Sequence, residues 1–284
     1  MLTTNQILTY ANATKITKNI LTEYYQHEIL DSLYRQKGSE KYVFIGGTAI
    51  RICYDGARFS EDLDFDTTDL DIFDALMQST INHMSSKGFI IESRLVHKGA
   101  YHCYLKFPHV LKNSGISGYA EEKLLIKIDA TKVEQLFTQS HLLNKYGIFQ
   151  TIRVAPESTI LSKKLITISE RIRPKGRDLY DVTYLWGMTE PDEKYLSNVA
   201  NQSLPQVLTK LSDYVKSLNL KALALDVSPF LTNPEDQVRV LHFDQFIESK
   251  INTSWYTHLY IICQRLSLLT HHIISRGTCP SPLD

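Results

Sequence analysis

The sequence predicts an α/β domain followed by an α-helical domain, with the boundary near residue 155. A short apolar run at 43–45 ends at a glycine pair and leads into a helix-like segment. β-rich stretches recur at 60–65, 89–95, 101–107 and 124–129, and an alternating pattern is typical of half-buried strands. From residue 156 onward the apolar residues recur at helical spacing instead. These observations predict two units, covering residues 1–155 and 156–284.

The composition is that of a folded globular protein. The chain of 284 residues is 43% hydrophobic and 22% charged, which excludes a disordered chain and allows a large core. Its 31 basic side chains equal its 31 acidic ones, so nucleic-acid binding would have to come from a local patch. The four cysteines form no Cys-x-x-Cys motif, which indicates neither a zinc site nor a redox pair.

Neither a signal peptide nor an apolar run of 18 residues is found. We therefore expect a cytoplasmic protein that does not cross a membrane.

The N-terminal elements can be predicted in order. Residues 5–37 have helical periodicity with a break at 11–14, so two helices are expected, with Thr14 or a neighbour capping the second. A further helix is predicted at 71–87. The stretches 89–95 and 101–107 are expected to pair around a turn at 98–100. Residues 108–120 contain glycines and a proline, which predicts a loop.

The glycine pair predicts a phosphate-binding turn. Gly46 and Gly47 follow an apolar strand and let the backbone turn sharply and approach a ligand. The helix expected from about Thr48 to Tyr54 offers unpaired N–H groups at its start, where phosphate groups bind well.

Two carboxylates follow on the next strand. In a strand from Ser60 to Phe65, Asp62 and Asp64 point to one face. Adjacent carboxylates repel each other unless a cation lies between them, and carboxylates together with phosphate oxygens are how proteins usually bind Mg²⁺. The two features together predict metal-assisted chemistry on a nucleotide.

This pattern resembles the polymerase-beta-like nucleotidyltransferase superfamily. The matching residues are Ile45-Gly46-Gly47-Thr48, a spacer of thirteen residues, and Asp62-Leu63-Asp64-Phe65. A longer string adds Arg51, Arg58 and Ser60, and it is similar to the abortive-infection nucleotidyltransferase toxins of the AbiEii/AbiGii group, which includes the MenT toxins. The resemblance implies a nucleotidyltransferase fold with a mixed, strongly twisted sheet and a C-terminal helical domain.

A third carboxylate is expected at Asp129. The stretch 124–129 places Leu124, Ile126 and Ile128 on one face and Asp129 on the other. An acid on an apolar strand loses hydration unless it is paired or binds metal, and the resemblance implies a metal-binding carboxylate on a neighbouring strand. The alternative is an aspartate that merely begins a turn at 130–131.

A basic block follows in the helical half. Residues 163–177 contain one acid, Glu170, and six bases: Lys163, Lys164, Arg171, Arg173, Lys175 and Arg177. Lys164 and Arg171 are seven residues apart and share a helix face, whereas Lys163 is turned about 100° away. With Arg177-Asp178-x-x-Asp181, the block is similar to the second motif of the family. The alternatives are a solvated face for the bases, an N-cap for Asp178 and a pair with Arg177 for Asp181.

The resemblance implies transfer of a nucleotide, from a pyrimidine triphosphate to the 3′ end of tRNA, by a bacterial toxin that blocks translation and has a cognate antitoxin. It implies two Mg²⁺ ions held by Asp62, Asp64 and Asp129, with phosphates bound by Gly46, Gly47 and Thr48. Lys164 is expected to be catalytic together with the three acids, and other nucleotide contacts are expected from Arg58, Ser60, Arg171 and Asp178. Three alternatives remain: an antibiotic-modifying nucleotidyltransferase, a protein-adenylylating enzyme, or an inactive binding module.

The last part of the chain yields no candidate site residues. Several helices are predicted after residue 192, the last at about 253–274, and the adjacent histidines His271 and His272 lack the spacing of a metal site.

Overall fold

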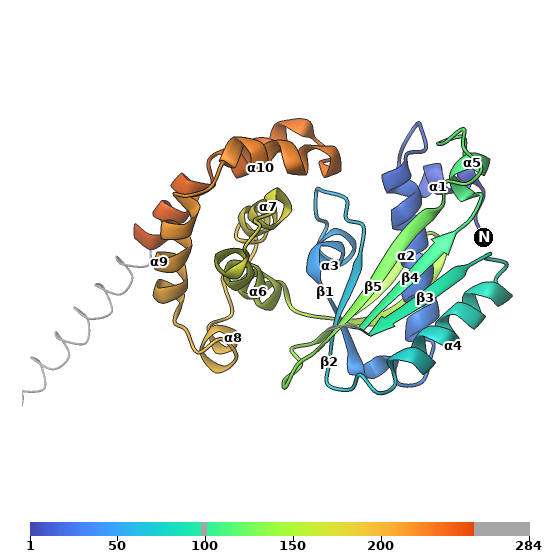
Figure 1. The fold of residues 1–284 in the computed structure, drawn as a ribbon, viewed down its shortest axis with the longest axis horizontal. Coiled ribbons are helices and arrows are strands. Elements are labelled where there is room, and N and C mark those ends of the chain that lie inside the picture. The colour runs from blue at the N-terminus through green and yellow to red at the C-terminus, as the bar shows by residue number, and fades with distance from the viewer. Residues whose placement is uncertain (98–100, 253–284) are drawn as a thin grey trace, which may run out of the picture.

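The structure is a computed structural model that describes residues 1–97 and 101–252. Strands and the N-terminal helices lie on one side of the molecule, and helices α6 to α10 lie on the other (Figure 1). The predicted α/β fold with a mixed sheet is confirmed. The last strand ends at Val154 and α6 begins at Glu157. No helix in the described ranges is long and apolar enough to cross a membrane.

A seven-stranded sheet has the order β3-β4-β5-β2-β1-β7-β6. The β2–β5 and β1–β7 pairs are parallel, and the other four pairs are antiparallel. The strands are β1 Tyr42–Ile45, β2 Leu63–Thr67, β3 Glu92–His97, β4 Tyr101–Phe107, β5 Leu124–Lys132, β6 Gln139–Lys145 and β7 Ile148–Val154.

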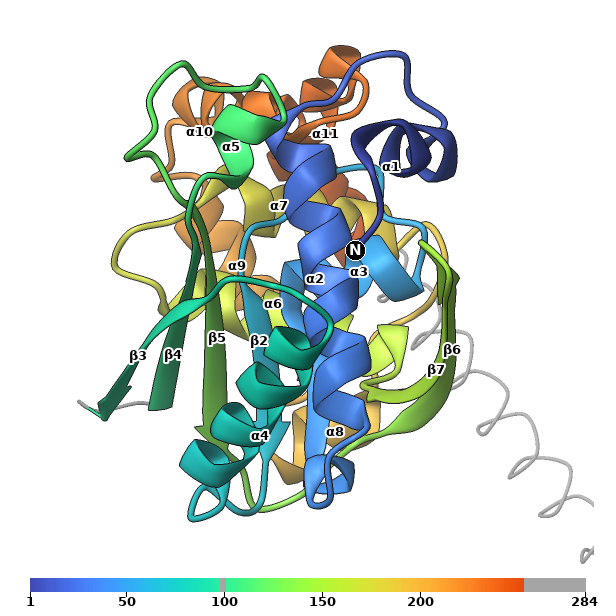
Figure 2. The same cartoon turned by 90° about the vertical axis from the view of Figure 1, so that its right-hand side faces the viewer.

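Helices α2 and α4 lie along one face of this sheet (Figure 2). Residues 20–33 of α2 are all buried, and Tyr25 packs edge-on against Phe107 of β4, with ring centroids 4.6 Å apart. Burial of these apolar side chains is the main stabilising contribution to the sheet–helix layers. The N-terminal helices are α1 Thr4–Ala11, α2 Lys18–Tyr34, α3 Gly46–Cys53, α4 Phe73–Ser86 and α5 Val110–Asn113.

The C-terminal half is helical, as predicted. Its labelled α-helices are α6 Glu157–Glu170, α7 Gly176–Leu185, α8 Glu193–Asn198, α9 Leu204–Val215, α10 Leu220–Val227 and α11 Val238–Leu241, and residues 243–252 are also helical. Helix α7 packs against α6, α10 and α11, so it forms the centre of this half. The helix predicted at 253–274, together with His271 and His272, lies outside the described residues.

Several local expectations differ from the structure. The second helix is capped by Thr17, three residues beyond Thr14, because its hydroxyl accepts a hydrogen bond from the Ile20 N–H. Short helix α5 lies within the predicted loop at 108–120. Strand β2 begins at Leu63 rather than Ser60. Strand β5 continues to Lys132, so Asp129 lies inside the strand and does not begin a turn.

The β6–β7 hairpin was not predicted. Its loop consists of Tyr146 and Gly147, both with positive φ, between the paired residues Lys145 and Ile148. Two residues with positive φ are typical of a tight hairpin turn. A tyrosine is a weak signal for such a turn, and the flanking strands are partly polar. These two facts explain why the hairpin was not predicted.

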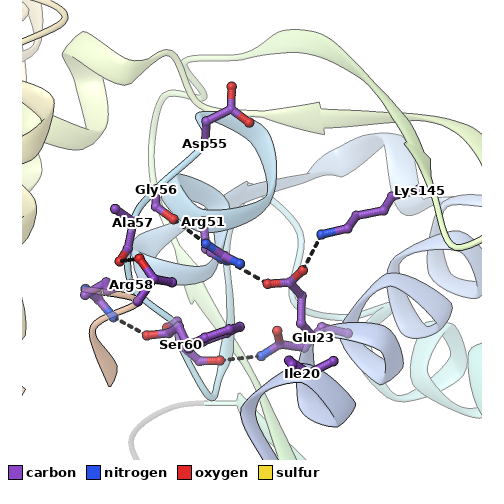
Figure 3. A network of polar contacts seen from close by, with 12 residues as sticks. Ile20, Glu23, Arg51, Asp55, Gly56, Ala57, Arg58, Ser60 and Lys145 are labelled. Atoms are coloured by element: carbon purple, nitrogen blue, oxygen red, sulfur yellow. Dashed lines mark hydrogen bonds and ion pairs between the residues drawn. The ribbon is translucent and has the colours of Figure 1, made fainter. Parts of the chain in front are cut away.

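A buried carboxylate joins three elements of the α/β half (Figure 3). Glu23 of α2 accepts from Arg51 of α3 at 2.6 Å and from Lys145 of β6 at 2.7 Å. Burial opposes the charged carboxylate, but Arg51 and Lys145 outweigh it and hold the pKa of Glu23 below its ordinary value. Arg51 also donates to the Gly56 carbonyl at 2.7 Å. Glu23 thereby fixes the loop that leads from α3 to β2.

We expect Glu23→Ala to lower the free energy of unfolding by about 1–3 kcal/mol, because it leaves Arg51 and Lys145, which are 20% and 35% exposed, without their shared partner. Urea denaturation measures this loss. The matched control is Asp213→Ala, which removes an acid that is 73% exposed in its pair with Lys216, and it is expected to cost less than about 1 kcal/mol. A similar loss in the two variants would contradict the role given to Glu23.

Candidate active site

Two carboxylates lie side by side on neighbouring strands. In the parallel β2–β5 pair, Asp64 is in register with Asp129. Leu63 and Phe65, which flank Asp64, are buried in the core, so the aspartates point to the opposite face of the sheet. Asp62 lies one residue before β2 and lines the same cleft as the other two. The fold therefore brings the three predicted acids together.

The electrostatics of these acids fit a cation-binding site. Burial, followed by the charges of Asp129 and Asp62, raises the pKa of Asp64 to about 6. Burial and the charges of Asp129 and Glu61 also raise the pKa of Asp62, against the opposing effect of Lys127. In the part of the chain that the structure describes, no hydrogen bond or ion pair is made by either of these two carboxylates. No preformed cluster of three metal-ligating side chains is found in that part either.

Asp129 differs because it has two protein partners. Its carboxylate contacts His102 Nδ1 at 2.5 Å and Lys127 Nζ at 2.6 Å. His102 is directly opposite Asp129 in the antiparallel β4–β5 pair. Neither His102 nor Lys127 was predicted from the sequence to lie in the site. The alternation of apolar and polar residues could have placed each of these two side chains on the polar face of its strand. Only the pairing of β4 with β5, however, brings His102 opposite Asp129.

The glycine pair allows close approach to these acids. Gly46 has φ +81°, and a Cβ atom there would overlap the Asp64 carboxylate. A Cβ at Gly47 would overlap the Arg58 guanidinium and lie 3.0 Å from Ser60 Oγ. Gly46, Gly47 and Ser60 all line the cleft. The first N–H groups of α3 lack intrahelical acceptors, as expected for a phosphate-binding turn.

Thr48 has a different environment from the one expected. It is completely buried, and its hydroxyl donates a hydrogen bond to the Asp62 carbonyl. That hydroxyl therefore positions the backbone of Asp62, and Thr48 itself does not line the cleft.

Arg58 also differs from expectation. It is 3% exposed, and it donates two hydrogen bonds of 2.6 Å to the two oxygens of Asp181 on α7. Lys164 of α6 contacts Asp181 at 2.9 Å and Asp178 at 2.7 Å. Arg171 also pairs with Asp178. The Arg58 guanidinium is thus paired with the Asp181 carboxylate and is not free to bind a nucleotide.

Burial alone would raise the pKa of Asp181, but Arg58 and Lys164 hold it below its ordinary value. Asp178 is not the N-cap of α7, which is Lys175, and Asp181 pairs with Arg58 rather than with Arg177. Lys164, Arg171 and Asp178 all line the cleft.

Most of the predicted basic patch is neutralised. Lys163 pairs with Asp66 of β2 and lines the cleft, so it is not turned away from it. Arg177 contacts Glu61 at 3.3 Å. Of the six bases only Arg173 and Lys175 are without an ion pair in the described ranges, and both are exposed. Asp66 and Glu61 come from a distant part of the sequence, which local composition cannot show, whereas Asp178, the partner of Lys164 and Arg171, directly follows the block.

A comparison with protein families identifies the chain. The model of the nucleotidyl transferase AbiEii toxin, of type IV toxin–antitoxin systems, matches residues 28–250. The chain belongs to the AbiEii family of nucleotidyltransferase toxins. The predicted resemblance is therefore confirmed, and family membership implies a partner antitoxin.

Solved structures share the fold of this AbiEii-family chain. MenT4, a nucleotidyltransferase toxin from Mycobacterium tuberculosis, is 20% identical, with a TM-score of 0.56 over 87% of this chain and 90% of MenT4. JHP933 from Helicobacter pylori is 16% identical, with a TM-score of 0.52 over 87% of this chain and 99% of JHP933. No curated protein matches the sequence.

We expect Gly46→Ala to lower nucleotide transfer by about a hundredfold, because the new methyl group displaces the Asp64 carboxylate. The positive φ adds a cost of about 1–3 kcal/mol in stability. Gly118→Ala is the control, since nothing lies within 4 Å of a Cβ there. Transfer assays and urea denaturation on both variants test this, and near-wild-type transfer by Gly46→Ala would contradict it.

Proposed function

We propose that this protein transfers a nucleotide, preferably a pyrimidine nucleotide, from its triphosphate to the 3′ end of tRNA in the cytoplasm, and so blocks translation. The observation that supports it most is the juxtaposition of Asp64 and Asp129 on paired parallel strands, with Asp62 beside them. The adjoining start of α3 offers N–H groups for phosphates. Membership of a nucleotidyltransferase toxin family supports the reaction class.

The donor set fits Mg²⁺, which prefers carboxylate and phosphate oxygens. Asp62 and Asp64 would hold two ions, and Asp129 would hold the one nearer the acceptor. When bound, the metal lowers the pKa of the acceptor hydroxyl and neutralises charge on the phosphates.

The protein's own residues bind and orient the reactants. The backbone at Gly46 and Gly47, which line the cleft, binds the β- and γ-phosphates, and Lys164 and Arg171 supply positive charge beside them. The 3′ oxygen of the acceptor attacks the α-phosphorus in line and forms the new phosphodiester bond. The bond from the α-phosphorus to the bridging oxygen breaks, and pyrophosphate leaves.

The deciding experiment is incubation of the protein with total tRNA and each labelled triphosphate separately. Labelled tRNA, with one pyrimidine triphosphate giving the most product, is expected. Label appearing only on protein or on an added aminoglycoside would contradict the proposal and favour the other nucleotidyltransferase reactions.

Asp64→Ala is expected to abolish transfer while the circular dichroism spectrum stays unchanged. A loss of even about 3 kcal/mol of transition-state stabilisation lowers the rate over a hundredfold. Asp71→Ala removes an exposed acid nearby and is expected to keep full activity. If Asp64→Ala retains activity within about threefold of wild type, the two-ion assignment fails.

The exposed bases of the α6–α7 loop test the RNA acceptor. Replacing Arg173 and Lys175 with Ser is expected to weaken tRNA binding and to flatten its log–log salt dependence by about one to two units. Triphosphate affinity is expected to fall less than tRNA binding, because Lys175 lines the cleft but Arg173 does not. An unchanged salt dependence would remove this loop from the RNA contact.

A further inference from the structure

The β3–β4–β5 part of the sheet has one face that carries polar and aromatic side chains. Along β4, Cys103, Leu105 and Phe107 are buried, and Phe107 packs against α2. Because side chains alternate along a strand, the residues between them point to the other face. We call this surface the open face; its side chains come from Glu92, Arg94, Val96, His102, Tyr104, Lys106, Leu125 and Lys127.

The strand register orders these side chains into rows. His102 is directly opposite Asp129, Tyr104 is opposite Lys127, and Lys106 is opposite Leu125. On the other side, Tyr104 is opposite Arg94. Directly opposite residues share a face of the sheet, and successive rows are about 7 Å apart. Asp129, Tyr104 and Lys106 therefore lie in three successive rows on this face of the sheet, and we call this series of rows the path.

The charge along the outer part of this path is positive. Arg94 and Lys106 are exposed and make no ion pair among the described residues, whereas the partly exposed Lys127 is paired with Asp129 at 2.6 Å. The acid of the outer row, Glu92, has its two carboxylate oxygens 2.7 Å from Lys123 Nζ, so its charge is neutralised. This contrasts with the α6–α7 block, where carboxylates pair most of the bases.

A hollow beside Tyr104 joins the open face to the active site. It is lined by Tyr104, Leu125 and Lys127 of the sheet, by the first turns of α2, and by the acids Glu61 and Asp62. Lys127 also lines the cleft of the three carboxylates. An aromatic ring and an aliphatic side chain in a hollow suit a base of single-stranded RNA, because bases stack on rings. The exposed bases Arg94 and Lys106 of the same face suit its phosphates, because phosphates contact cations.

We infer that the open face binds the single-stranded 3′ end of the RNA acceptor. One base stacks on Tyr104 in the hollow, Arg94 and Lys106 contact the phosphates of the preceding nucleotides, and the terminal ribose reaches Asp129. This inference rests on the proposed function, and it names the surface that positions the acceptor. The α6–α7 loop then faces the body of the RNA, so the two contacts are separable.

The test uses two synthetic RNA hairpins, one with a four-nucleotide single-stranded 3′ end and one blunt. Tyr104→Ala is expected to weaken binding of the tailed hairpin about tenfold and to leave binding of the blunt hairpin and of triphosphate unchanged. Tyr104→Phe keeps the ring and is expected to bind like wild type. Phe149→Ala is the control, because Phe149 is 69% exposed on the distant strand β7.

The basic residues are tested in the same way. Replacing both Arg94 and Lys106 with Ser is expected to flatten the salt dependence of tailed-hairpin binding by about 1.4, the value for two phosphates of a single strand. The control replaces Lys210 and Lys216, which are exposed on or beside α9, and is expected to change nothing.

The outcomes separate the inference from the proposed function. If wild type labels RNA but Tyr104→Ala and the Arg94/Lys106 variant bind and label the tailed hairpin like wild type, the inference is wrong and the proposed function stands. If wild type neither binds nor labels either hairpin or tRNA, both are wrong. Equal weakening of tailed and blunt hairpins by Tyr104→Ala would also overturn the inference, because it would indicate a duplex contact or a structural defect.

Discussion

The ion pair between Arg58 and Asp181 is the contact on which the site depends. It joins the segment that precedes β2 to helix α7, across 123 positions of sequence. Both side chains are almost completely buried, so each charge is tolerable only while the other is present. Lys164 is held by the same carboxylate. The helical half is thereby fixed against the strand that carries Asp64, and the cleft between them has a defined width.

The same network sets the charge of the cleft. Arg58, Lys164 and Arg171 contribute three positive charges, and Asp178 and Asp181 contribute two negative ones, which leaves one positive charge. This surplus lies at the cleft wall, opposite the carboxylates of β2 and β5. A triphosphate carrying metal ions needs such an arrangement, with anionic groups for the metal on one side and a cationic wall for phosphate oxygens on the other.

Features that depend on residues close together in the chain could be predicted from the sequence. The glycine pair and the alternation around Asp62 and Asp64 lie within twenty residues of each other, and an acid on the apolar stretch at 124–129 stands out by itself. Contacts between distant segments could not be predicted in this way. The Asp181 partner of Arg58, the Asp66 partner of Lys163 and the His102 contact with Asp129 each depend on packing or strand register. Thr48 shows the same limit, because its hydroxyl turned inward to a backbone carbonyl that only the folded loop provides.

The neutralised bases of the α6–α7 block have a consequence for selectivity in a crowded cell. A bare polycationic surface binds any nucleic acid, and such a protein would be sequestered by ribosomes and chromosomal DNA. Here carboxylates pair four of the six bases, and the chain as a whole has no net charge. Long nucleic-acid duplexes therefore meet few unpaired cations on this block. Under the proposed function, such a toxin binds most nucleic acids only briefly and modifies those whose 3′ end fits its cleft.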